Sequence, residues 1–78
     1  MSVVRSRHLL RAGRPFACDD TWRDTYAVVT DGTVEVRTPH GGRLRLLTGD
    51  VLCLARIGPA VLLAPGPDDA VLTTIRRN

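Results

Sequence analysis

Apolar residues along this chain occur in short runs or alternate with polar residues, and clusters of Gly, Pro, Asp and Thr separate them. Alternation of this kind is typical of β-strands with one buried face, and no stretch shows the period of an amphipathic helix. Strands are expected at residues 4–11, 22–30, 33–37, 43–47, 51–55, 60–64 and 70–76. This pattern predicts an all-β fold, a small antiparallel barrel of about six to seven strands without substantial helix.

Two turns in the middle of the chain give an expected register. Asp31 and Gly32 are a strong signal for a two-residue hairpin, because both residues tolerate the positive φ of a type I′ turn. A three-residue loop at 39–41 forms the next hairpin and pairs Val36 with Leu44. Together the two hairpins predict a three-stranded sheet. Its apolar face consists of Ala27, Val29, Val34, Val36, Leu44 and Leu46. Its polar face carries Tyr26, Val28, Glu35, Arg37, Arg43 and Arg45.

The chain has 78 residues, which corresponds to a single domain. We divide it into an irregular N-terminal segment with one strand, 1–21, and a β-barrel core, 22–78. A chain this short buries only about 60% of its unfolded surface, so its core is small. The runs at 51–54 and 61–63 are almost continuously apolar, as in strands with both faces covered. We therefore expect a homodimer in which a second subunit covers one of these faces.

The composition excludes several kinds of chemistry. All eleven Lys and Arg residues are Arg, so chemistry that requires a lysine amine is excluded. The only serines, Ser2 and Ser6, fall in the expected N-terminal tail, which argues against a serine nucleophile. Neither a P-loop nor a GxGxxG motif is present. The net charge is +3, but eight acidic residues are spread along the chain, so we interpret the charge as a solvated mixed surface.

The distribution of apolar residues also bears on location. The longest apolar runs have five residues, whereas a membrane-spanning helix needs about 20. The first residues include Arg but no following apolar segment, so we expect no signal peptide and a cytoplasmic protein without membrane contact. The two cysteines, Cys18 and Cys53, fit a reducing compartment.

Two segments of the chain carry a family resemblance. The chain reads YAVVTDGTVEVR from Tyr26 and, after a short turn, LRLLTGDVLCL from Leu44. This order of a strand, a Gly-containing turn, a strand, a hairpin and a Gly-Asp pair before an apolar strand resembles the cupin superfamily. Gly32, Gly49 and Asp50 stand at the matching positions.

The resemblance extends over about residues 20–76 and implies a cupin-like β-barrel or jelly roll. It does not specify an activity, because one fold can host many functions. The turn chemistry agrees with it: Gly49 provides a positive φ, and Asp50 is placed to accept hydrogen bonds from backbone amides at the strand entry.

The chain departs from the family at the metal site. Cupin enzymes usually hold a metal with two His and a Glu before the first Gly turn and a third His after the Gly-Asp strand. The corresponding positions here, within 18–24 and near Ala60, contain no His. Cys18, Asp20 and Asp24 reproduce the intervals and are the candidate ligands for a divalent cation. Zn²⁺ and Fe²⁺ sites contain more imidazole or thiolate than this set, so we expect no metal or cofactor.

Aromatic and basic residues supply the candidate ligand-binding set. Trp22 and Tyr26 are four residues apart, so on a strand they share a face and either line a pocket or cover the edge of a core. Arg37 and Arg45 add positive charge, although beside Glu35 they also fit a solvated outer face. His8 and the Arg76–Arg77 pair are expected in exposed tails.

These observations leave three functional hypotheses. The preferred one is a non-enzymatic, cupin-like binding module for a small molecule or a protein partner, with a regulatory role and a homodimeric state. The alternative is a small isomerase, cyclase or lyase that uses Asp24, Cys18 or His40 at the barrel mouth. A nucleic-acid-binding protein ranks below both. It would use the arginines of the expected polar face, Arg37, Arg43 and Arg45.

Overall fold

The structure is a computed structural model that describes residues 2–57 and 60–77. Within these residues there are eight strands and two single helical turns. The strands are β1 (Val3–Leu10), β2 (Phe16–Ala17), β3 (Thr25–Asp31), β4 (Val34–Arg37), β5 (Arg43–Leu46), β6 (Val51–Cys53), β7 (Val61–Leu63) and β8 (Ala70–Arg77). The helical turns are η1 (Asp20–Trp22) and α1 (Leu54–Ile57). The all-β prediction is confirmed. The expected number of six to seven strands was too low, because β2 has only two residues and is too short to show an alternating pattern in the sequence.

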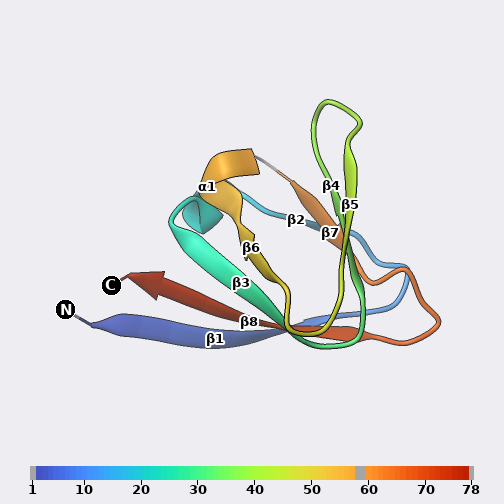
Figure 1. Ribbon diagram of the computed structural model, residues 1–78, viewed down its shortest axis with the longest axis horizontal. Helices are drawn as coiled ribbons and strands as arrows, with labels where there is room; N and C mark the ends of the chain where they lie inside the picture. The colour runs from blue at the N-terminus through green and yellow to red at the C-terminus, as the bar shows by residue number, and fades with distance from the viewer. Residues whose placement is uncertain (1, 58–59, 78) are drawn as a thin grey trace.

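The strands form two antiparallel sheets of four strands each. The first sheet has the order β1-β8-β3-β6, and the second has the order β2-β7-β4-β5. Figure 1 shows the two sheets diverging, with β1, β8 and β3 fanned out toward the two chain ends and the β4–β5 hairpin projecting on the other side. In both sheets the first half of the chain pairs with the second half, as β1 with β8, β2 with β7, β3 with β6 and β4 with β5.

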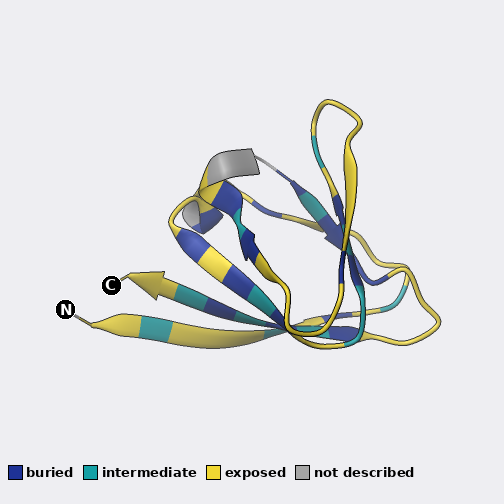
Figure 2. Ribbon diagram, in the orientation of Figure 1, coloured by how far each residue is buried: buried dark blue, intermediate teal, exposed yellow. Residues whose placement is uncertain are grey.

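The core lies between the inner faces of the two sheets and follows the period-two alternation of the strands. The first sheet contributes Leu10, Ala27, Val29, Leu52, Ala70 and Leu72 to the core. The second sheet and the residues next to it contribute Val34, Val36, Leu46, Ala60, Leu62 and Ala64. In Figure 2, buried positions alternate with exposed or half-buried positions along β3 and β8, whereas most of β1, at the sheet edge, is exposed.

The expected hairpin at Asp31 and Gly32 is wrong, and with it the three-stranded sheet. β3 pairs with β6 and β8, while β4 pairs with β5 and β7, so the chain crosses from one sheet to the other at this point. Among the described residues only glycines have a positive φ, which excludes a type I′ turn at Asp31. Ala27 and Val29 are buried as expected, but they face Val34 across the core instead of lying beside it.

The hairpin between β4 and β5 is confirmed in its expected register. Val36 pairs with Leu44, Glu35 with Arg45, and Arg37 with Arg43. Leu44 was expected in the core but is 49% exposed. Leu44 is the second residue of β5, next to the turn of the β4–β5 hairpin, and Figure 1 shows this hairpin projecting away from the first sheet.

The turn between β5 and β6 also agrees with the sequence. Gly49 has a φ of +97°, and Asp50 Oδ2 accepts a hydrogen bond of 2.8 Å from the Leu47 amide. The Gly49 amide in turn donates to the Val29 carbonyl at 2.8 Å and connects this turn to β3. The motif that suggested the family resemblance therefore has the turn conformation expected of it.

Several predicted boundaries shift. The strand expected from Trp22 begins at Thr25, because the preceding residues form η1, and the strand expected at 51–55 ends at Cys53, where α1 begins. The expected loop at 56–59 begins inside α1, and residues 58–59 lie outside the described residues. His8, Arg76 and Arg77 belong to the paired strands β1 and β8 and not to tails; the two arginines are exposed as expected, whereas His8 is half-buried. Within the described part of the chain, no helix has the length and apolar character needed to cross a membrane.

Candidate ligand pocket

A pocket of about 180 Å³ opens on the inner face of the first sheet, at the end where the two chain termini lie side by side (Figure 1). We call it the inner pocket. It is lined by Val4, Ser6, His8, Trp22, Thr25, Thr74 and Arg76. Four elements contribute to it, namely β1, η1, β3 and β8. The pocket therefore depends on the assembled sheet and not on any one segment of the chain.

Strand register explains why these residues meet. Alternate residues of β8 from Ala70 through Leu72 to Thr74 are buried, and Arg76 follows on the same side of the strand, exposed at the open end. Arg76 pairs with Val4 on one side and with Thr25 on the other. Directly paired residues in an antiparallel sheet hold their Cβ atoms about 5 Å apart, so these side chains are immediate neighbours. In the next row, Thr74 pairs with Ser6, and its hydroxyl donates to the Ser6 carbonyl at 3.3 Å.

Two of the lining residues, His8 and Trp22, belong to a cluster of three aromatic rings that Phe16 completes beside the pocket. The η1 turn presents the Trp22 ring, which lies 5.0 Å from the His8 ring and 5.4 Å from the Phe16 ring, measured between centroids. The His8 and Phe16 rings are 6.3 Å apart. A backbone hydrogen bond of 3.1 Å from the Trp22 amide to the Asp19 carbonyl holds the turn. Trp22 is only 9% exposed, so it serves both as core and as pocket wall.

The inner pocket combines hydrogen-bonding groups with one apolar wall. Ser6, Thr25 and Thr74 carry hydroxyls, His8 carries an imidazole and Arg76 a guanidinium, while Val4 and Trp22 provide apolar surface. Among the described residues that line the pocket there is no Asp or Glu. Such a lining can bind and orient a small polar molecule. Ser6 and His8 both line the pocket, but among the described residues no hydrogen bond joins the imidazole to a hydroxyl.

The candidate ligand-binding residues are separated by the fold. Trp22 lines the inner pocket, but Tyr26 is 53% exposed and lies on the opposite, outer face of the first sheet. The prediction that Trp22 and Tyr26 share a face is wrong, because Trp22 belongs to η1 and the strand begins only at Thr25. Arg37 and Arg45 lie on the second sheet and line neither pocket.

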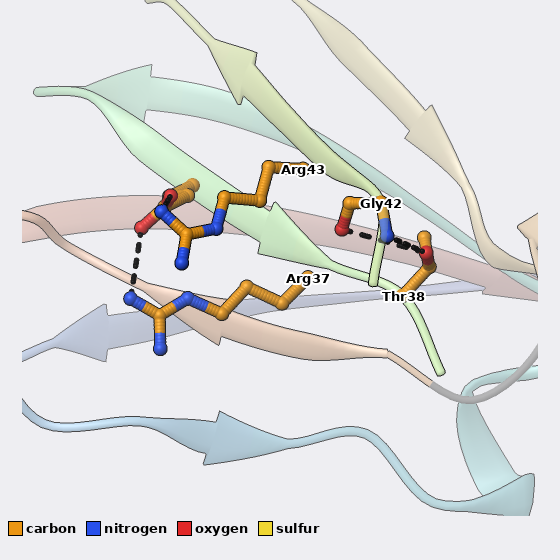
Figure 3. A network of polar contacts seen from close by, with 5 residues as sticks. Arg37, Thr38, Gly42 and Arg43 are labelled. Atoms are coloured by element: carbon orange, nitrogen blue, oxygen red, sulfur yellow. Dashed lines mark hydrogen bonds and ion pairs between the residues drawn. The ribbon is translucent and has the colours of Figure 1, made fainter. Parts of the chain in front are cut away.

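The arginines of the second sheet have a local partner. Arg37 Nη2 lies 3.3 Å from Glu35 Oε2, and Arg43 Nη1 lies 3.9 Å from Glu35 Oε1 (Figure 3). Arg45 stands directly across from Glu35 in the sheet. Figure 3 also shows the hairpin end held by hydrogen bonds between Thr38 and Gly42. A carboxylate beside these arginines reduces the positive field that a phosphate backbone would meet.

The three candidate metal ligands do not converge. Cys18 and Asp20 line a small pocket beside η1, whereas Asp24 lines a groove on the outer face of the first sheet. Burial, with a further contribution from the charge of Asp19, raises the pKa of the Cys18 thiol to about 11, so the thiolate that a metal needs is disfavoured. Among the described residues, no group of three His, Cys, Asp or Glu side chains is arranged to hold a metal ion. These residues do not fit a cupin metal site.

The groups of the enzyme hypothesis are also dispersed. His40 lies in the turn between β4 and β5 and lines neither the inner pocket, nor the groove with Asp24, nor the pocket with Cys18. Cys18 and Asp24 line different pockets. The structure therefore does not bring Asp24, Cys18 and His40 together at one reaction centre.

Sequence reasoning missed most of the inner pocket. His8 and Arg76 were assigned to tails, and Thr25 and Thr74 were not considered. The only available signal was the period of two, which places Thr74 and Arg76 on the same side of β8 as the buried Ala70 and Leu72, although Arg76 itself is exposed. Only the pairing of β8 with both β1 and β3 shows that these positions share one cavity.

Comparison with known proteins gives no matching family model and no similar curated protein. The arguments for function below therefore rest on the residues and geometry of this chain.

Proposed function

We propose that the chain is a cupin-like jelly roll that acts as a binding module, and that its inner pocket takes up a small molecule without catalysing a reaction on it. The inner pocket, with three hydroxyls, an imidazole, a guanidinium and a tryptophan at the open end of the core, is the observation that carries this proposal. A mostly polar lining with one aromatic wall suits recognition of a small polar compound.

The strand order supports the cupin-like jelly roll. A jelly roll has eight strands in two antiparallel sheets, and each sheet contains strands from both halves of the chain. The orders β1-β8-β3-β6 and β2-β7-β4-β5 have this arrangement, since β1 to β4 each pair with one of β8 to β5 in turn. The conformations of Gly32 and Gly49 and the hydrogen bond to Asp50 agree with the turn positions of the family resemblance.

The dispersal of the candidate catalytic groups favours binding over catalysis. Cys18 is buried with a raised thiol pKa, and His40 and Asp24 lie elsewhere on the fold. We also propose that binding needs no metal, because the inner pocket contains one imidazole and no carboxylate among its described lining residues.

A homodimer is the second part of the proposal. The outer face of the first sheet is the surface formed by the alternate residues of β3, β6 and β8 that point away from the core. It carries Tyr26, Val28, Val51, Cys53 and Ile75. A groove of about 630 Å³ runs over part of this face. Tyr26 and Val51 are more than half exposed, and exposed apolar surface of this kind commonly marks an interface.

The single tryptophan provides a direct test of the binding function. Trp22 is the only tryptophan in the chain and lines the inner pocket, so its fluorescence reports occupancy. We expect a screen of small polar compounds, charged and neutral, to yield compounds that change Trp22 emission in a saturable way. In a ¹⁵N-labelled sample these compounds are expected to shift the amides of Ser6, Thr25 and Thr74 and to leave the β4–β5 hairpin unchanged.

The controls separate binding from other outcomes. Thr74→Val replaces a hydroxyl of the pocket with a methyl of similar size and is expected to weaken binding without unfolding the chain. A screen in which no compound saturates, or in which the amide shifts gather outside the inner pocket, would overturn the proposed function.

A further inference from the structure

We infer that the ligand of the inner pocket is a small organic acid, with its carboxylate held by Arg76 and its apolar portion against Trp22. The inference rests on the proposed function, because it names the ligand class of the same pocket. It draws on three independent properties of the lining, which are its charge, its hydroxyl donors and its size.

Charge distinguishes the inner pocket from the other pockets. The outer groove contains Asp24, and the small pocket beside η1 contains Asp19 and Asp20. The described lining of the inner pocket contains Arg76 and no acidic side chain. Among residues 2–57 and 60–77, no ion pair engages Arg76, in contrast to Arg37, which is paired with Glu35. The planar guanidinium of an unpaired arginine matches a carboxylate with two parallel hydrogen bonds.

Residues with hydroxyl groups lie next to Arg76 in the sheet and in the pocket lining. Thr25 pairs directly with Arg76 across the strands, and Ser6 and Thr74 form the next row toward the core. Thr25 and Thr74 are only 5% and 6% exposed and form the inner end of the pocket, whereas Arg76 is exposed at its mouth. A hydroxyl donates one hydrogen bond, and the Thr74 hydroxyl gives its own to the Ser6 carbonyl, so the hydroxyls of Ser6 and Thr25 are the ones offered to an anion. The arrangement gives a carboxylate a charged contact from Arg76 and a neutral one from the adjacent Thr25.

Size and apolar surface limit the rest of the ligand. The volume of about 180 Å³ is below the range of roughly 300–1,000 Å³ that holds drug-sized molecules. Trp22 forms an apolar wall whose position is fixed by the His8 and Phe16 rings. An organic acid with a short aliphatic or single-ring portion fills such a space, and inorganic phosphate would leave the Trp22 wall without contact.

Matched acid and amide pairs test the inference. Propionate is compared with propionamide and benzoate with benzamide, with Trp22 fluorescence and calorimetry as readouts. Each pair has nearly the same shape and differs in charge. Since hydrogen bonds to a charged group are stronger than those to a neutral one, we expect the acid of at least one pair to bind about ten-fold more tightly than its amide. Inorganic phosphate is expected to bind more weakly than that acid.

The chain offers a matched control for the arginine. Arg76→Gln and Arg77→Gln each remove one positive charge from the same strand, but Arg76 lines the inner pocket and Arg77 lines the outer groove. We expect Arg76→Gln to abolish the preference for the acid and Arg77→Gln to retain it. Arg76→Lys keeps the charge without the planar fork and should give an intermediate preference. If Arg76→Gln fails to fold, Thr25→Val tests the adjacent contact and should reduce acid binding several-fold.

The outcomes distinguish the two proposals. Amides that bind as tightly as their acids, or an Arg77→Gln variant that loses the preference as fully as Arg76→Gln, would overturn the organic-acid inference and leave the binding function in place. Phosphate that binds as tightly as the carboxylates would overturn the assignment of an apolar ligand portion to Trp22. Failure of every compound, charged or neutral, to bind would overturn the proposed function itself.

Discussion

Cys18 and Arg76 show how local surroundings decide what a side chain can do. The sequence suggested Cys18 as a metal ligand or nucleophile and assigned Arg76 to a tail. In the structure Cys18 is 7% exposed and its thiol has a raised pKa, whereas Arg76 lines an open pocket among hydroxyls. Cys18, although a reactive residue type, is buried with its thiol protonated. Arg76, for which the sequence suggested no role, lies at the candidate site.

The raised pKa of Cys18 leads to a prediction about pH. The unfolded thiol ionises near its usual pKa of 9.0, while the folded thiol keeps its proton up to about 11. Above pH 9 the unfolded state therefore binds fewer protons than the folded state, and the free energy of unfolding falls as the pH rises toward 11. We expect this loss to be roughly 1 to 3 kcal/mol.

Urea denaturation across this pH range measures the effect. Other groups also titrate in alkali, so the quantity to compare is the difference between the wild-type chain and Cys18→Ala at each pH. That difference should shrink from pH 9 to about pH 11, since alanine has no proton to lose. A difference that stays constant over the range would contradict the buried, protonated thiol.

At the scale of elements, Gly32 is the point where the chain passes from the first sheet to the second. It has a φ of +81°, and a Cβ added there would lie 2.9 Å from the Asp69 carbonyl oxygen. Its own carbonyl accepts a hydrogen bond of 3.1 Å from the Thr48 hydroxyl. Gly32 is therefore required for a close approach of three segments, in addition to the backbone conformation it supplies.

Gly32→Ala is expected to destabilise the chain more than Gly41→Ala. Both glycines have nearly the same positive φ, but an added Cβ at Gly41 meets nothing within 4 Å. The left-handed conformation costs each variant about 1–2 kcal/mol. Steric crowding against the Asp69 carbonyl should cost Gly32→Ala roughly 1 kcal/mol or more beyond that. Chemical denaturation of the two variants measures the difference, and equal losses would show that the close approach has no energetic consequence.

At the scale of the whole molecule, the two faces of the first sheet differ in how far they are covered. The inner face packs on the second sheet, whereas the outer face leaves Tyr26 at 53% and Val51 at 59% exposure. The sequence predicted that the apolar run at 51–54 would be covered on both sides. The single chain covers one side, and the proposed homodimer would cover the other.

A charge on the outer face should therefore dissociate the dimer. Val51→Glu adds a charge to this face, and because Val51 is exposed in the single chain the variant should still fold. We expect light scattering to give twice the chain mass for the wild-type protein and the mass of one chain for Val51→Glu. Leu44→Glu, at an exposed position of the second sheet, is the control and should remain dimeric. A monomeric wild-type protein at high concentration would refute the dimer.

The sequence by itself determined the fold class, most strands, the β4–β5 register and the turn at Gly49 and Asp50. The alternation of apolar and polar residues along a strand predicts which of them are buried. Gly and Asp indicate turns because of their local backbone preferences. Each of these signals is contained in a few neighbouring residues, and for this reason these features can be predicted from the sequence. The burial of Ala27 and Val34 was predicted correctly for the same reason.

Only the tertiary structure decided which strands lie beside each other. The hydrophobic pattern of β3 and β4 is the same whether the two strands pair within one sheet or face each other across the core. The pattern therefore cannot distinguish the two arrangements. The choice depends on contacts between distant segments, such as Gly32 with the backbone at Asp69. The inner pocket has the same origin, because His8, Thr25 and Arg76 become neighbours only when β8 is inserted between β1 and β3.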